Sequence, residues 1–197
     1  MSHEVYEIVK KMDLKDIETQ LALQCAPLIT GLKISNLLIL SSENERVVKS
    51  ILDKSMISYY RLLKNDEKIT YLLFKRQELE RVIKDEDVWK IFRSNGYKTL
   101  HIGKILRTFQ LRYEDYVNGN IEFPHEMGLL LGYPVEDVVG FVDNKGKNFL
   151  YSGYWKVYKN MKEKVKLFRK FEVAEETLIH MVSNGVSIID IIDIYNT

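Results

Sequence analysis

Apolar residues recur at intervals of three and four along much of the chain, which is the spacing of an amphipathic helix. The clearest case runs from Ile102 to Tyr116, where apolar side chains follow one helix face. Ser, Asp and Pro at the starts of such stretches, and Gly or Asn at their ends, mark the boundaries. Together these signals predict one or two helices over residues 4–25 and single helices over 42–65, 85–96, 102–118, 124–132, 134–146 and 159–184.

Three other stretches have the pattern of β-strands. Leu37 to Leu40 and Ile69 to Phe74 are short apolar runs typical of buried strands, and Phe149 to Tyr158 alternates between the two faces of a strand. We therefore place strands near 36–40, 69–75 and 149–158. The first two flank a predicted helix within about forty residues, which is the length of a βαβ unit.

These elements predict an α/β or α+β fold in which helices dominate a small central sheet of about three or more strands, with one βαβ unit in it. Neither a repeat nor a Pro- or Ser-rich linker divides the chain, so we expect a single domain over residues 1–197. The Ile-rich tail over 187–197 fits a helix or a strand. Its apolar residues make it a candidate contact of a homodimer.

Composition narrows the classes of function. Apolar residues make up 46% of the 197 residues, which is typical of a globular chain. The net charge is only +1, so we expect no overall positive electrostatic field that would attract nucleic acid. The single cysteine, Cys25, excludes an internal disulfide framework and a Cys-rich zinc site, and the histidines lack the spacing of metal ligands. Because no signal-peptide pattern and no bilayer-spanning apolar run occur, we expect a cytoplasmic protein without a membrane segment.

Polar and aromatic side chains are concentrated in residues 123–158, where Gly and Pro fix the backbone. This segment begins FPHEMGLLLGYPVEDVVGF and ends GYWKVY. Rigid turns hold side chains at fixed positions, which makes them natural places for a site. We therefore predict a site for an unidentified small molecule or protein partner, formed by His125, Glu126, Tyr133, Tyr154, Trp155 and Lys156. No pattern in the chain identifies a cofactor, and the same residues would equally form a structural corner.

Two other functions would use parts of the same region. Cys25 as a nucleophile with His125 as its base would make a thiol-dependent enzyme, although a lone cysteine is usually a small buried apolar residue. A helix-turn-helix-like pair over 126–144, together with a basic stretch over 156–170, would bind nucleic acid. Glu136 and Asp137 would then face phosphates, which makes nucleic-acid binding the weaker hypothesis.

The same motifs resemble a known family. The stretch from Leu23 to Lys33 (LQCAPLITGLK), the FPHEMGLLLGYPVEDVVGF segment and GYWKVY are similar to the bacterial domain-of-unknown-function family numbered 3793, found mainly in anaerobic Gram-positive bacteria. The resemblance extends from about Leu21 to the start of the last long helix. It implies no particular reaction, cofactor or partner.

Overall fold

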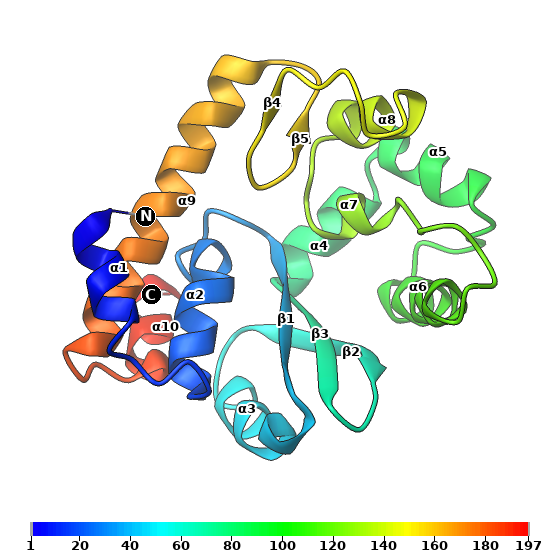
Figure 1. Ribbon diagram of the computed structural model, residues 1–197. Coiled ribbons are helices and arrows are strands. Elements are labelled where there is room, and N and C mark those ends of the chain that lie inside the picture. Colours follow the sequence, from blue (N-terminus) through cyan, green and yellow to red (C-terminus); the bar gives the residue numbers. More distant parts are fainter. Residues whose placement is uncertain (1, 197) are drawn as a thin grey trace.

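The computed structural model describes residues 2–196, in which helices surround a small antiparallel sheet (Figure 1). The sheet contains β1 (Ser35–Ser41), β2 (Ser58–Lys64) and β3 (Lys68–Phe74) in the order β1-β3-β2. A separate hairpin pairs β4 (Tyr151–Ser152) with β5 (Lys156–Val157). The predicted class, with a small sheet and dominant helices, is confirmed as α+β.

The central strand β3 is buried on both faces. Its side chains alternate between two hydrophobic clusters, with Ile69, Tyr71 and Leu73 in the first cluster and Leu72 and Phe74 in the second. This double burial explains why the strand reads as a nearly continuous apolar run. The sheet is therefore the middle layer of three.

Helices cover both faces of the sheet. The first cluster is closed by α2 (Ile17–Ile29), α3 (Glu45–Leu52), the C-terminal part of α9 (Met161–Ser183) and α10 (Ile188–Asn196). The second cluster is closed by α4 (Arg76–Ile83), α5 (Glu86–Ser94), α6 (Ile102–Val117), α7 (Met127–Leu130) and the start of α8 (Val135–Asp143). The short α1 (His3–Val9) packs on α9. A third cluster joins the β4–β5 hairpin to the N-terminal half of α9 through Trp155, Val157, Phe168 and Phe171.

The predicted βαβ unit has β2, and not β3, as its second strand. The strands expected to form the unit, β1 and β3, are adjacent and antiparallel. Strands β1 and β2 both run antiparallel to β3, so they are parallel to each other, and α3 connects them in a split βαβ unit while β3 lies between them. The assignment of one helix over 42–65 was wrong, because α3 ends at Leu52 after a 3₁₀ turn at Ser42–Asn44 and residues 58–64 form β2. Tyr59 packs on the first cluster whereas Tyr60 and Leu62 face the second, a period of two that the helical pattern concealed.

Of the one or two helices expected over 4–25, the structure has two, α1 and α2. Two further boundaries differ from the predictions. The strand expected over 149–158 is a hairpin that turns at Gly153. The helix expected over 124–132 shortens to the four residues of α7.

The Ile-rich tail forms α10, whose Ile188, Ile191 and Ile192 are buried in the first cluster. These buried side chains are used inside the protein, whereas Ile194 of the same tail is exposed. The homodimer contact expected of the tail stays a prediction. Thr197 lies outside the described residues. Within residues 2–196, no helix combines the length and the apolar composition that crossing a bilayer requires, and the cytoplasmic location stays a prediction.

Candidate functional site

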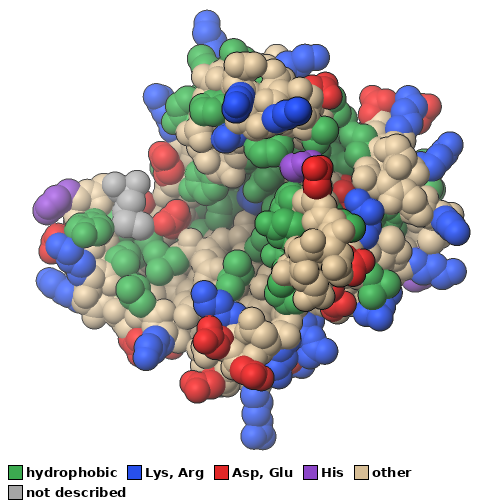
Figure 2. Space-filling view, turned by 45° about the vertical axis from the view of Figure 1, so that its right-hand side comes forward, with side chains coloured by type: hydrophobic (Ala, Val, Ile, Leu, Met, Phe, Trp, Pro, Cys, Tyr) green, Lys and Arg blue, Asp and Glu red, His purple; other side chains and the backbone are tan. Residues whose placement is uncertain are grey.

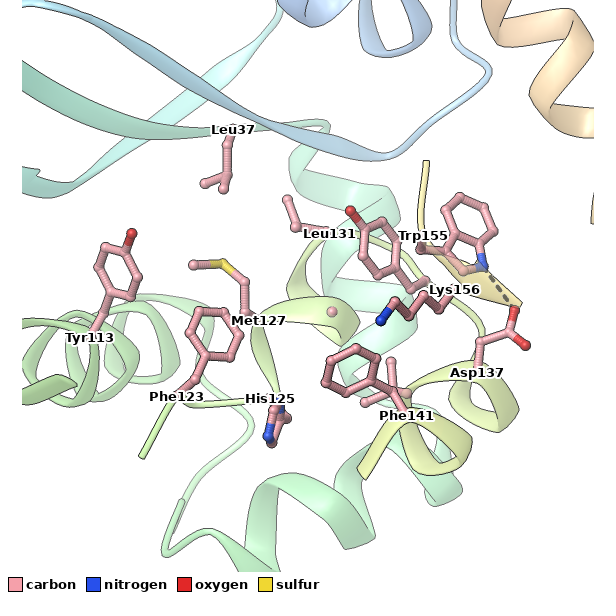
Figure 3. A pocket seen from close by; sticks show the side chains of 13 residues that line it. Leu37, Tyr113, Phe123, His125, Met127, Leu131, Asp137, Phe141, Trp155 and Lys156 are labelled. Carbon is pink, nitrogen blue, oxygen red and sulfur yellow. Dashed lines mark hydrogen bonds between the residues drawn. The ribbon is translucent and has the colours of Figure 1, made fainter. Parts of the chain in front are cut away.

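A largely apolar pocket of about 380 Å³ opens between the sheet and the 123–158 segment. Figure 2 shows hydrophobic side chains in the walls of a hollow on one face of the molecule, and Figure 3 shows the pocket from close by. Side chains from β1, α6, α7, α8 and β5 contribute to it. The lining consists of Leu37, Tyr113, Phe123, His125, Met127, Gly128, Leu131, Tyr133, Asp137, Val138, Phe141, Trp155 and Lys156.

Four of the six predicted site residues line this pocket. Tyr133 stacks on Trp155 with a centroid separation of 4.8 Å, and the His125 ring lies 5.3 Å from that of Phe141. The Nζ atom of Lys156 lies 5.6 Å from the centre of the same Phe141 ring. The FPHE corner and the GYWKVY segment therefore meet at one cavity, and their role in binding stays a prediction.

The other two predicted residues lie outside the lining. Glu126 is 2% exposed, and its Oε1 accepts hydrogen bonds from Arg112 Nε at 2.6 Å and from the Tyr97 hydroxyl at 3.1 Å. A carboxylate with these partners serves to join α6 to the FPHE corner. Tyr154 packs edge-on against Phe171 at 5.0 Å, in the third cluster. The positions of Glu126 and Tyr154 in the sequence indicate that they lie near the pocket but not the direction in which their side chains point.

One wall of the pocket is held by the buried carboxylate of Asp137. Its Oδ2 accepts a hydrogen bond from Trp155 Nε1 at 2.8 Å, drawn in Figure 3, and its Oδ1 accepts the backbone N–H of Tyr158 at 2.8 Å and of Lys159 at 3.3 Å. Asp137 thus fixes both the indole that lines the pocket and the end of β5. Acidic side chains are common in the first turn of helices, where they interact favourably with the helix dipole, so nothing in the sequence indicated that Asp137 is buried.

The charge of Asp137 is balanced by Lys164 of α9, which is itself buried. The ammonium of Lys164 lies 3.3 Å from Asp137 Oδ2 and 2.6 Å from Glu136 Oε1, and it donates to the carbonyl of Lys159 at 3.0 Å. A buried charge is tolerated only when it is paired and hydrogen-bonded in this way. The result is a rigid junction of α8, β5 and α9 behind the pocket.

Two glycines allow the elements around the pocket to approach closely. A Cβ atom at Gly128 would lie 2.8 Å from Val138 Cγ2, and one at Gly140 would lie 2.5 Å from Tyr158 Cγ. Both separations are shorter than van der Waals contact, so any larger residue would push α7 from α8 or α8 from β5. Packing therefore accounts for these two glycines of the 123–158 segment.

The thiol of Cys25 does not line the pocket. The residue is 0% exposed in α2, and burial raises the pKa of the thiol to about 12. At neutral pH it is therefore protonated, whereas the nucleophilic form of cysteine is the thiolate. This environment favours an inert core cysteine over the nucleophile of an enzyme.

The proposed nucleic-acid elements are largely occupied by internal contacts. All four residues of α7 are buried, so this helix belongs to the core. In the basic stretch, Lys164 is paired with two carboxylates and Lys156 lines the pocket. Among the residues that the structure describes, no three His, Cys, Asp or Glu side chains gather as metal ligands would.

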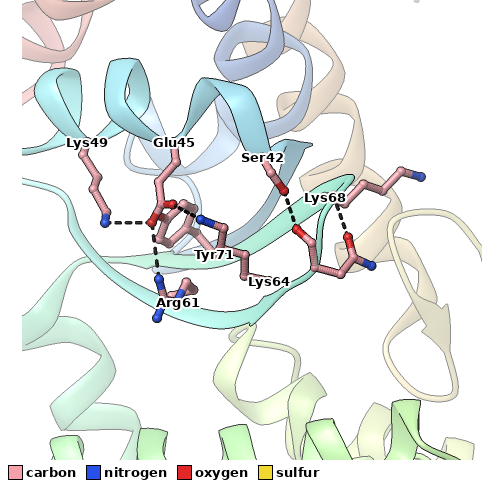
Figure 4. Close-up of polar contacts among 8 residues, drawn as sticks. Ser42, Glu45, Lys49, Arg61, Lys64, Lys68 and Tyr71 are labelled. Atoms are coloured by element: carbon pink, nitrogen blue, oxygen red, sulfur yellow. Dashed lines mark hydrogen bonds and ion pairs between the residues drawn. The ribbon is translucent and has the colours of Figure 1, made fainter.

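A second polar cluster lies away from the pocket, around Glu45 at the start of α3 (Figure 4). Its carboxylate lies 2.8 Å from Lys49 Nζ, 2.7 Å from Lys64 Nζ and 3.4 Å from Arg61, and it accepts a hydrogen bond from the Tyr71 hydroxyl at 3.1 Å. Hydrogen bonds from Lys49 and Lys64 are the main cause that lowers the pKa of Glu45 to about 2. These contacts tie α3 to β2 and β3, which makes the cluster structural.

Replacing Asp137 with Asn should destabilise the fold, because Lys164 would lose one of its two counter-charges while still buried. We expect the free energy of unfolding to fall by about 3 kcal/mol, as when one partner of a buried ion pair is removed. Urea denaturation at neutral pH measures this. Glu136→Gln is the matched control, since Glu136 is 32% exposed, and it should cost clearly less. Equal losses would contradict the anchoring position of Asp137.

The Cys25 thiol should resist alkylation in the folded protein. Iodoacetamide at neutral pH is expected to leave it unmodified over hours, because the thiol is both buried and protonated, and to modify it rapidly in urea. Mass spectrometry of the intact protein follows the reaction. Rapid modification without denaturant would show an accessible thiolate and restore the enzyme hypothesis.

The Glu45 cluster should stabilise the protein in a pH-dependent way. The folded pKa of about 2 lies below the usual 4.5, so the stabilisation is fully present above pH 4.5 and is lost as the pH falls toward 2. Glu45→Gln should therefore lower the free energy of unfolding by about 1 kcal/mol at pH 7 and by less at pH 3. Urea titrations at both pH values test this, with the exposed Glu43→Gln as the control. A difference that grows toward low pH would refute the assignment.

Comparison with known proteins identifies the family of the chain. The sequence profile of DUF3793, described as a protein of unknown function, matches residues 21–192. No curated protein and no solved structure matches the chain. The matched range includes the LQCAP, FPHE and GYWKVY motifs and confirms the resemblance found in the sequence. The chain therefore belongs to DUF3793, a family of proteins of unknown function.

Proposed function

We propose that the protein binds a small, largely apolar molecule in the pocket between β1 and the 123–158 segment. The observation that carries this proposal is an open cavity of about 380 Å³ with an aromatic and aliphatic lining. Ligand sites are typically concave, mostly apolar and about 300–1,000 Å³ in volume, with a few polar groups that orient the ligand. Since a water molecule occupies about 30 Å³ of liquid, the space suits a ligand of roughly a dozen non-hydrogen atoms.

The rigidity of the walls supports this function. Trp155 is held by Asp137 on one side and stacks on Tyr133 on the other, and α7 and α8 are in contact at Gly128. A cavity whose walls are fixed in this way exists before a ligand arrives, so little binding energy is spent on ordering side chains. Protein interiors are close-packed, so a cavity of this size with a mostly apolar lining is typical of a binding site.

Filling the pocket should abolish binding. Leu37 of β1 extends into the cavity opposite His125 and Phe141 (Figure 3), so Leu37→Trp places an indole where the ligand would lie. We expect the affinity for 2-naphthol, followed by its fluorescence, to fall at least tenfold, or about 1.4 kcal/mol.

Ile39→Trp is the matched control, because Ile39 lies two residues further on the same face of β1, is 43% exposed and does not line the pocket. It should leave the affinity within about twofold of the unchanged protein, because a substitution at an exposed position outside the lining has a small effect. Failure of 2-naphthol to bind the unchanged protein, or equal binding by both variants, would refute the proposed function.

A further inference from the structure

The hydrogen-bond acceptors and donors in the pocket wall are unequally occupied. Asp137 is the carboxylate of the lining, and both of its oxygens already accept hydrogen bonds from Trp155, Tyr158 and Lys159. The ammonium of Lys164 adds a further contact to Oδ2. A ligand donor entering the pocket would therefore find this carboxylate saturated.

The donors of the lining have capacity left. Lys156 uses one of its three N–H groups on the carbonyl of Gly146 at 2.7 Å, and within residues 2–196 no carboxylate lies within 4.0 Å of its Nζ. The side chains of His125 and Tyr113 make ring contacts but no hydrogen bond in the described part of the chain. The pocket thus offers donors and one cation without a counter-charge.

These donors lie around one ring. Lys156 Nζ is 5.6 Å and the His125 ring 5.3 Å from the centre of Phe141, and Figure 3 shows both beside that ring. The Lys33 ammonium stands 5.4 Å from the centre of the Tyr133 ring and bonds to the amide oxygen of Asn36, and burial lowers its pKa to about 8. Of these two lysines, Lys156 is the one that lines the pocket.

We propose that the ligand is a monocarboxylate with a compact apolar body of about a dozen non-hydrogen atoms, the size set by the cavity. Its carboxylate bonds to the ammonium of Lys156, with His125 as the second donor, and its body lies against Leu37, Met127 and Phe141. A charge-assisted hydrogen bond in an apolar setting is stronger than a neutral one, and the ligand supplies the counter-charge that Lys156 lacks. This inference rests on the proposed function and specifies the class of ligand for the same pocket.

Octanoate and octan-1-ol form a matched pair of probes, because they share an apolar chain and differ in the carboxylate. Isothermal titration at neutral pH and low salt should give a dissociation constant at least tenfold lower for octanoate, and this preference should shrink as salt is added. A parallel titration with 3-phenylpropionate distinguishes aromatic from aliphatic bodies. Lys156→Met should remove the preference for octanoate while leaving octan-1-ol binding within about twofold, and Lys156→Arg should retain it.

Lys147→Met is the control for general charge, since Lys147 is exposed nearby and does not line the pocket. Circular dichroism of each variant establishes that it is folded, and retained binding of octan-1-ol establishes that the pocket is intact. Equal affinities for octanoate and octan-1-ol in the unchanged protein, or an octanoate preference that survives Lys156→Met, would overturn the carboxylate assignment and leave the proposed function standing. If neither probe nor 2-naphthol binds, the proposed function itself fails, and this inference fails with it.

Discussion

The buried carboxylate of Asp137 is the interaction on which the pocket depends. It lies on α8 and accepts hydrogen bonds from the indole of Trp155 and from the backbone at the end of β5. The ammonium of Lys164 brings α9 to the same point. Three elements that are separate in sequence, α8, β5 and α9, are thereby fixed at the Asp137 carboxylate. Separating them would leave a buried polar or charged group without its partner, which is energetically unfavourable.

Anchoring of this wall has a consequence for the chemistry of the pocket. By satisfying its own hydrogen bonds inside the protein, Asp137 contributes no acceptor to the cavity, whereas Lys156 and His125 line it as donors. The close approach of α7 and α8 at Gly128 then shapes an apolar floor. The interaction that stabilises the wall therefore also leaves the pocket lining with donors that a carboxylate ligand, as proposed, would match.

The sequence predicted local features better than long-range ones. Strands β1 and β3 were predicted from their continuous apolar runs and α6 from its helical periodicity. The concentration of polar and aromatic residues in the 123–158 segment identified four residues that line the pocket. Strand β2 was missed because its apolar residues also fit a helical repeat. Its period of two becomes visible only in the structure, where alternate side chains pack on the two hydrophobic clusters. Leu37 and Tyr113 were missed as lining residues because they come from β1 and α6, which tertiary packing alone brings to the 123–158 segment.

A crystal structure of the protein grown with octanoate would test this account most directly. We expect the aliphatic chain to lie between Leu37 and Phe141 and one carboxylate oxygen to lie within hydrogen-bonding distance of Lys156 Nζ, at about 2.7–2.9 Å. Octanoate bound elsewhere on the surface, or a pocket that stays without ligand at saturating concentration, would contradict it.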